Sequence, residues 1–154
     1  MNCYKILLLC LLPLTGFGQS DKDFVSLNSA DTQICPESGN ILLMMDFQIV
    51  EGYHIQADEV LNDNFIPTEL ELLSLEDLAI CELAYSEAKT IFLDENEPLL
   101  VFNKQFTITA IFLPPFAESE SYCLEAVLSY QTCDGQKCFF PRELYLEIPM
   151  EIKV

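Results

Sequence analysis

The alternation of apolar and polar residues between positions 104 and 113 is the feature that most restricts the fold. Apolar side chains occupy every second position there, at Phe106, Ile108, Ala110 and Phe112. Residues 69–75 repeat the period, with Leu70 and Leu72 expected to point inward. A period of two is typical of a half-buried β-strand, because successive side chains of a strand point to opposite faces. The chain is therefore expected to be built from strands that cover a core on one face.

Further strands are predicted wherever apolar runs are bounded by turn signals such as Glu51-Gly52 and Pro114-Pro115. Residues 76–88 could form a helix by composition, but 79–85 are interpreted as a strand. About eight or nine strands without an internal repeat predict an all-β fold, a single-domain antiparallel β-sandwich of immunoglobulin-like type. The other predicted strands are 40–50, 52–57, 122–133 and 144–154.

The first 18 residues have the pattern of a secretory signal peptide. Lys5 supplies a positive charge, residues 6–12 are apolar, and Gly16-Phe17-Gly18 is a small-x-small cleavage site. Cys10 permits a lipidated or uncleaved alternative, but cleavage before Gln19 is favoured. The expected organisation is a signal peptide at 1–18, an irregular segment at 19–37 and a folded domain at 38–154. The expected location is periplasmic or secreted, where disulfides form.

The chain carries a formal net charge of −18, from 25 acidic and 7 basic residues. Nucleic acids and anionic membranes are bound through cationic contacts, so neither is expected as a partner. After the leader, no apolar run approaches the roughly 20 residues that a membrane span needs. Because 51% of the residues are hydrophobic, a disordered acidic tail is also excluded.

Two cysteines occupy mirrored positions across a predicted hairpin turn. If Gly135 and Gln136 are the turn residues, Asp134 faces Lys137 and Cys133 faces Cys138. Directly opposed residues of antiparallel strands have Cα atoms about 4.5–5.5 Å apart, at the short end of what a disulfide accepts. The spacing therefore predicts a disulfide between adjacent strands.

Such a bridge closes a very small loop, so it restricts the unfolded chain little. Strained and accessible disulfides are the ones that exchange, which favours a redox role over a static staple. Lys137 would favour a thiolate at Cys138, whereas Asp134 would oppose one at Cys133. A structural hairpin disulfide in a non-enzymatic binding module remains the alternative.

The pattern Tyr130-Gln131-x-Cys133-x4-Cys138-x-x-Pro141 resembles the closing motif of the N-terminal periplasmic domain of DsbD, the thiol:disulfide interchange protein. Residues 52–55, Gly-Tyr-His-Ile, are similar to that family's Gly-Tyr/Trp-x-Ile strand. The resemblance spans residues 38–154. It implies an immunoglobulin-like domain in which Cys133 and Cys138 cycle between dithiol and disulfide, with Cys138 attacked first.

The resemblance also implies partners. The family accepts electrons from a membrane-embedded donor and passes them to thioredoxin-like periplasmic proteins, so a separately encoded membrane donor is expected here. A degenerate relay that binds redox proteins without turnover is a weaker alternative. Family members shield the cysteines with an aromatic cap loop. The nearest candidate here is residues 92–96, with Phe92 as the aromatic residue.

The remaining candidates are assigned supporting or structural roles. His54 is the only histidine and is interpreted as a strand residue with its ring at the surface, or as a proton acceptor near the cysteine pair. Tyr53 and Tyr130 are expected in the core or at a sheet edge, and Pro141 is expected to end a strand's pairing. The absence of a CxxC motif argues against zinc, and no organic cofactor or metal is expected.

Three further cysteines follow the predicted leader, at Cys35, Cys81 and Cys123. With the hairpin pair they make an odd number. One additional disulfide and one buried free thiol are therefore expected, without a preferred connectivity.

Overall fold

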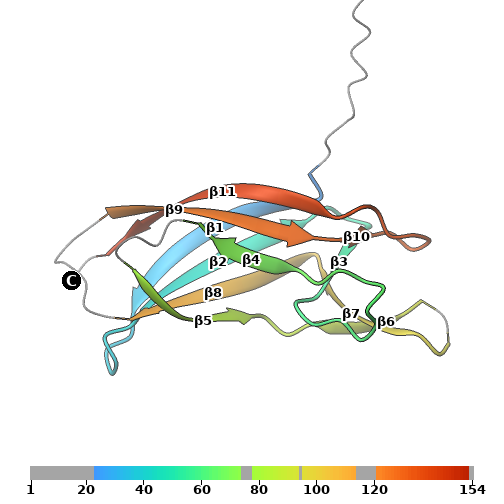
Figure 1. Ribbon diagram of the computed structural model, residues 1–154, viewed down its shortest axis with the longest axis horizontal. Helices are drawn as coiled ribbons and strands as arrows, with labels where there is room; N and C mark the ends of the chain where they lie inside the picture. Colours follow the sequence, from blue (N-terminus) through green and yellow to red (C-terminus); the bar gives the residue numbers. More distant parts are fainter. Residues whose placement is uncertain (1–22, 74–77, 94, 114–120, 153–154) are drawn as a thin grey trace, which may run out of the picture.

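The computed structural model describes residues 23–73, 78–93, 95–113 and 121–152, which form eleven β-strands and no helix (Figure 1). Consequently, none of these ranges contains a helix that could cross a membrane. The predicted signal peptide at 1–18 lies outside the described residues. The strands are β1 (Val25–Ile34), β2 (Ile41–Ile49), β3 (His54–Gln56), β4 (Glu69–Leu72), β5 (Ala79–Tyr85), β6 (Lys89–Phe92), β7 (Pro98–Asn103), β8 (Gln105–Leu113), β9 (Ser121–Tyr130), β10 (Thr132–Cys133) and β11 (Arg142–Glu151).

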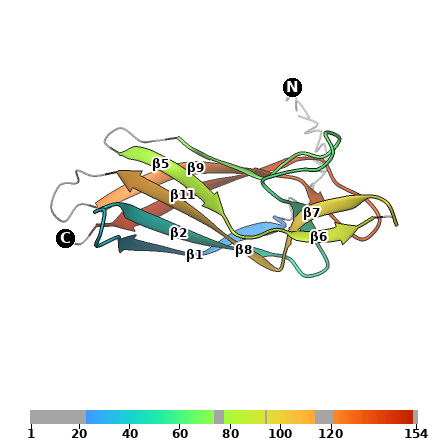
Figure 2. The same ribbon diagram turned by 90° about the horizontal axis from the view of Figure 1, so that it is seen from below.

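Two antiparallel sheets form the layers of a sandwich, with strand orders β1-β2-β8-β5 and β11-β9-β4. A third sheet, of order β10-β3-β7-β6, lies at one end of the elongated molecule (Figures 1 and 2). It joins the layers because β10 follows β9 after Gln131, and β8 follows β7 after Lys104. Lys104 has a φ of 64°, a left-handed conformation at which the chain passes from one sheet to the other. The predicted all-β, immunoglobulin-like antiparallel sandwich is confirmed.

The core lies between the layers and follows the period-two pattern of the sequence. Alternate residues of β2 and β8 are buried, and β9 and β11 supply the facing side chains. Each large aliphatic side chain buried in this way stabilises the fold by about 1.5–3 kcal/mol. Stacked aromatic rings extend the core toward the third sheet, with Phe106 lying 5.0 Å from Phe47 and 4.8 Å from Phe102, centroid to centroid.

The pairing of β9 with β11 fixes where the cysteine hairpin begins. The two strands pair continuously from Glu151 opposite Ser121 to Arg142 opposite Tyr130. The chain leaves this ladder after Tyr130, forms β10 and the turn, and returns at Arg142. The hairpin is therefore attached to the longest strand pairing within the described ranges.

The structure corrects two predictions about strands. The segment 19–37, expected to be irregular, contains β1, which pairs with β2 from Val25 to Ile34. β1 is an edge strand with many exposed polar residues, so its sequence lacks a clear apolar period. No strand was predicted between residues 86 and 103, but the structure has β6 there and also β7, which begins at Pro98 and pairs with β6. Proline is tolerated there because it is the first residue of the strand.

Candidate functional site

Cys133 and Cys138 form a disulfide across a tight hairpin, as predicted. Their Cα atoms are 3.9 Å apart, and the two residues form an antiparallel bridge. The Asp134 N–H donates to the carbonyl oxygen of Lys137 at 2.9 Å, which closes the turn over Gly135 and Gln136. The facing of Cys133 with Cys138 is thus confirmed, with a Cα separation below the range expected for opposed residues.

The side chain of Asp134 stabilises this turn. Its Oδ1 accepts the backbone N–H groups of Gln136 at 2.7 Å and Lys137 at 2.8 Å. These hydrogen bonds hold the pKa of the Asp134 carboxyl below its ordinary value, because they favour its ionised form. The turn that brings the two cysteines together is therefore stabilised by the carboxylate of Asp134, which lies between them in sequence.

The two sulfur-bearing residues differ in exposure. Cys133 is 0% exposed, whereas Cys138 is partly exposed and lines an open hollow of about 370 Å³. Phe140, 91% exposed, and Pro141 stand beside it on the same hollow. A thiolate from another protein can therefore approach Cys138 but not Cys133.

Phe139 anchors the returning arm of the hairpin. Its ring centroid lies 5.4 Å from that of Phe24 and 6.1 Å from that of Tyr53. The Nζ atom of Lys137 lies 5.2 Å from the centroid of the Phe139 ring, in a cation–π arrangement. The ammonium of Lys137 therefore lies over the ring of Phe139, the residue that follows Cys138.

Gln131 ties the hairpin to a neighbouring loop. Its Nε2 donates to the carbonyl oxygen of Phe139 at 3.2 Å, and its Oε1 accepts the N–H of Ile66 at 3.0 Å. The N–H of Phe139 in turn donates to the carbonyl oxygen of Thr132 at 2.8 Å. Gln131 therefore holds both arms of the hairpin against the segment that precedes β4.

His54 lies directly opposite Cys133 in the pairing of β3 with β10, and opposite Asn103 in the pairing with β7. Its strand position is confirmed. The residue is partly exposed, but its Nε2 atom is buried, so the ring does not lie wholly at the surface. That atom has no hydrogen-bond partner among the described residues. Burial lowers the pKa of His54, and the nearby charge of Asp134 partly opposes this shift. A lowered pKa keeps the imidazole neutral at pH 7, so it can accept a proton.

Gln56 contacts the buried sulfur and was missed by the sequence analysis. Its Nε2 donates to Sγ of Cys133 at 3.4 Å, and the residue is 1% exposed. In sequence it looks like an ordinary polar position of a short alternating strand. Only the pairing of β3 with β10 reveals that its side chain is a diagonal neighbour of Cys133.

The other predicted site residues take different places. Tyr130 is buried in the core, and this burial raises the pKa of its hydroxyl. Pro141 directly precedes β11, where the pairing with β9 begins. Phe92 ends β6 and is 64% exposed, while the hollow beside Cys138 is lined by other residues. The proposed cap segment 92–96 also includes Asp94, which lies outside the described residues.

The remaining described cysteines are free, which corrects the expectation of a second disulfide and a buried thiol. Cys35 is partly exposed in the turn between β1 and β2, and Cys81 and Cys123 are exposed. Cys81 lies on β5 and Cys123 on β9, which belong to different layers of the sandwich. Within the described ranges, no group of three His, Cys, Asp or Glu side chains is placed to hold a metal ion.

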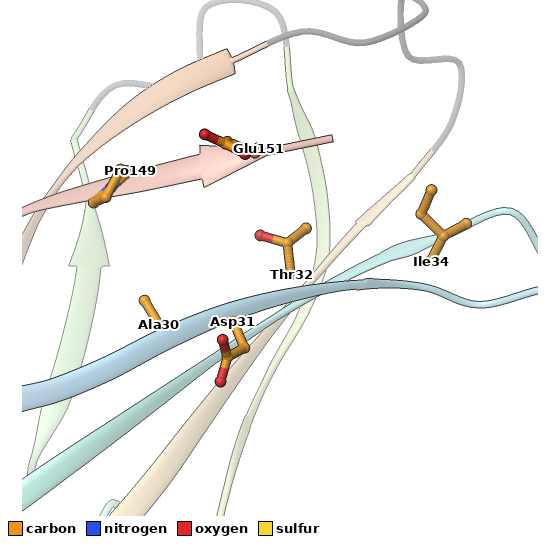
Figure 3. Close-up of a pocket in the computed structure, with 6 residues that line it drawn as sticks. All are labelled: Ala30, Asp31, Thr32, Ile34, Pro149 and Glu151. Carbon is orange, nitrogen blue, oxygen red and sulfur yellow. The ribbon is translucent and has the colours of Figure 1, made fainter. Parts of the chain in front are cut away.

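A second open hollow, of about 520 Å³, lies between β1 and β11 (Figure 3). Asp31 and Glu151 belong to its lining but come from different strands, and Figure 3 shows their side chains pointing apart. Its lining residues are Ala30, Asp31, Thr32, Ile34, Pro149 and Glu151, which include no cysteine or histidine. The cysteine hairpin is therefore the better candidate site.

Comparisons with solved structures identify the fold. The N-terminal periplasmic domain of ScsB from Proteus mirabilis superposes with a TM-score of 0.55 at 12% identity, covering 84% of this chain and 47% of that chain. This chain thus spans about half the length of that ScsB chain. No protein-family model and no curated protein matches the sequence.

Two structures from Neisseria meningitidis are also similar. The reduced DsbD N-terminal domain has a TM-score of 0.46 at 12% identity, covering 79% of this chain and 87% of that chain. The complex between the DsbD N-terminal and PilB N-terminal domains has a TM-score of 0.45 at 12% identity, covering 77% of this chain and 79% of that chain. At these identities the likeness concerns the fold. The fold expected from the sequence is confirmed by the superposition on the ScsB domain.

Proposed function

We propose that this chain is a thiol:disulfide interchange domain that passes electron pairs between thioredoxin-like proteins. The observation that carries the proposal is the Cys133–Cys138 disulfide, which has one buried half and one half at an open hollow. The fold shared with the ScsB periplasmic domain supports it. The proposed location is periplasmic or secreted, and the proposed electron source is a separately encoded membrane protein.

The exposure of the two cysteines sets the order of events. A partner thiolate attacks Sγ of Cys138, the S–S bond breaks, and Cys133 leaves as a thiolate that takes up a proton. A second thiolate of the partner then attacks the partner's own sulfur in the mixed disulfide and releases Cys138. Two electrons and two protons have then moved from the partner dithiol to this domain. The reverse sequence reduces a disulfide of the next partner.

The surroundings of Cys138 provide contacts for a partner and for proton transfer. Phe140 and Pro141 offer an apolar surface beside the sulfur that is attacked. The neutral imidazole of His54, opposite Cys133, serves as an acceptor when the Cys133 thiol loses its proton. Gln131 acts through Phe139 to keep the hairpin in place.

A structural disulfide is the second candidate, favoured by the complete burial of Cys133. In that case the bridge would hold the hairpin against β3 and would resist mild reductants. Replacement of both cysteines by alanine would then lower the free energy of unfolding measurably. The two candidates therefore differ in the reduction potential of the same bond.

Titration of the purified protein in glutathione redox buffers, with mass spectrometry to locate the reduced sulfurs, distinguishes the candidates. An exchange domain is expected to have a potential above about −300 mV, within reach of cellular dithiols. A much lower potential would establish the structural role instead.

Trapping with a thioredoxin that has one active-site cysteine tests the order of attack; its second cysteine is replaced by serine, and the remaining thiol is activated as a mixed disulfide with thionitrobenzoate. Reduced Cys133→Ser should displace thionitrobenzoate and form a stable mixed disulfide through Cys138, because neither protein then holds a second thiol that could release it. Reduced Cys138→Ser should form none. Cys123→Ser, which removes a free and exposed thiol far from the hairpin, should behave like the unmodified protein. Equal trapping by both hairpin variants would contradict the assignment.

A further inference from the structure

Gln56 is a fully buried amide that donates to a sulfur atom. Its Nε2 lies 3.4 Å from Sγ of Cys133. Its backbone is fixed on both sides, because its N–H donates to the carbonyl oxygen of Gln131 at 3.1 Å and its carbonyl oxygen accepts the hydroxyl of Thr68 at 2.5 Å. The strand that carries it lies between β10 and β7. The backbone of Gln56 is thus fixed both by the hairpin arm, through Gln131, and by Thr68 and β7, which lie outside the hairpin.

This contact is a weak one in the oxidised protein. A disulfide sulfur is a poor acceptor, so it returns little of the free energy lost when an amide is removed from water. A thiolate at the same position would carry a full negative charge. Hydrogen bonds to charged acceptors are roughly twice as strong as bonds between neutral groups. The same donor therefore stabilises the reduced thiolate more than the oxidised disulfide.

We propose that Gln56 is a catalytic hydrogen-bond donor for the thiolate of Cys133, an inference that rests on the proposed function. When a partner thiolate forms its bond to Sγ of Cys138, the electron pair of the broken S–S bond moves to Sγ of Cys133. The Gln56 amide lies next to that atom before the bond breaks. It therefore needs no rearrangement to stabilise the leaving group.

The charged and titratable groups around this sulfur explain why a neutral donor is needed. Asp134 follows Cys133 directly in sequence and disfavours a second negative charge. His54, on the strand opposite, has a pKa lowered by burial and is neutral at pH 7. The ammonium of Lys137 lies over the ring of Phe139. The described contacts thus supply an amide hydrogen, and not a cation, to the thiolate of Cys133.

The test compares Gln56→Leu, which keeps a similar volume without a donor, with Thr132→Val. Thr132 is a matched control because it is buried beside Cys133 and its hydroxyl has no partner in the described part of the chain. Both changes are made after serine replaces Cys35, Cys81 and Cys123, the three free cysteines among the described residues. With Cys138→Ser added, thiolate absorbance reports the pKa of Cys133. Gln56→Leu should raise this pKa by about one to two units, and Thr132→Val should leave it unchanged.

With both hairpin cysteines present, Gln56→Leu should also slow reduction by dithiothreitol about tenfold or more. Gln56→Asn shortens the side chain by one methylene group, so its amide no longer reaches the sulfur, and this variant should behave like Gln56→Leu. It is the second variant to use if Gln56→Leu fails to fold. In the unmodified protein, the side-chain amide protons of Gln56 should shift in NMR spectra when the disulfide is reduced above the pKa of Cys133. Unchanged amide shifts, or variants that match the control, would overturn the role of Gln56.

The same measurements separate this inference from the function on which it rests. An unmodified disulfide that resists dithiothreitol would remove both proposals. A readily reduced disulfide with an unaltered Cys133 pKa in the Gln56 variants would remove only the role of Gln56.

Discussion

The ring of Phe139 packs on the ring of Phe24, with centroids 5.4 Å apart. Phe24 directly precedes β1, and Phe139 directly follows Cys138. The arm of the hairpin that carries the accessible sulfur is therefore held by the first described segment of the domain. The position of Cys138 depends on packing far from the turn itself.

Phe139→Leu should lower the free energy of unfolding by about 1–2 kcal/mol, because it removes ring contacts with Phe24 and Tyr53. It should also speed reduction of the disulfide by loosening the arm at Cys138. Phe140→Leu is the matched control. Its ring is exposed, so the change should stay within about 0.5 kcal/mol. Urea denaturation and dithiothreitol kinetics measure both effects, and equal results for the two variants would contradict the anchoring role.

His54 should make the stability depend on pH below its unfolded pKa of about 6.5. Burial lowers its folded pKa, so the unfolded chain binds more protons in the interval between the two values. The contribution of neutral His54 is fully present above about pH 6.5 and is lost as the pH falls toward the folded pKa. As the pH falls through this interval, the free energy of unfolding should therefore decrease more for the unmodified protein than for His54→Gln.

NMR titration of the ring measures the folded pKa directly, without overlap, because the chain has one histidine. A folded value at or above that of a model histidine would refute the prediction.

Gln131→Leu should destabilise the protein by about 1–2 kcal/mol, because the N–H of Ile66 and the carbonyl oxygen of Phe139 both lose their side-chain partner. Hydrogen exchange at the Ile66 amide should become faster. Gln136→Leu is the control, since its side chain is exposed at the turn. Protection of the Ile66 amide that is the same in both variants would show that Gln131 does not connect the loop to the hairpin.

Asp134→Ala should open the turn more often than Asp134→Asn, because asparagine retains an oxygen acceptor for the N–H groups of Gln136 and Lys137. Hydrogen exchange at these two amides measures the opening. The lowered pKa of Asp134 means that the carboxylate's contribution is present above an unfolded pKa of about 3.9. It should be lost as the pH falls through the folded value. Exchange rates that are equal in the two variants would argue against the turn-stabilising hydrogen bonds.

The strands that could be predicted are those whose alternate residues are buried. β8 matches its predicted range because Phe106, Ile108, Ala110 and Phe112 all face the core. β1 was not predicted because it pairs with β2 alone and leaves much of its surface to solvent. β7 was hidden by Pro98, which marks a loop in most contexts but here begins a strand.

The hairpin and its disulfide could be deduced from the sequence because they involve residues 130–141, where spacing and turn residues act locally. The burial of Cys133, the buried Nε2 of His54 and the donor at Gln56 could not. Gln56 lies 77 positions from Cys133 and reaches it only because β3 pairs with β10. Local chemistry thus determined that two sulfurs would meet, whereas the packing of distant strands decided which sulfur faces solvent and which groups surround the other.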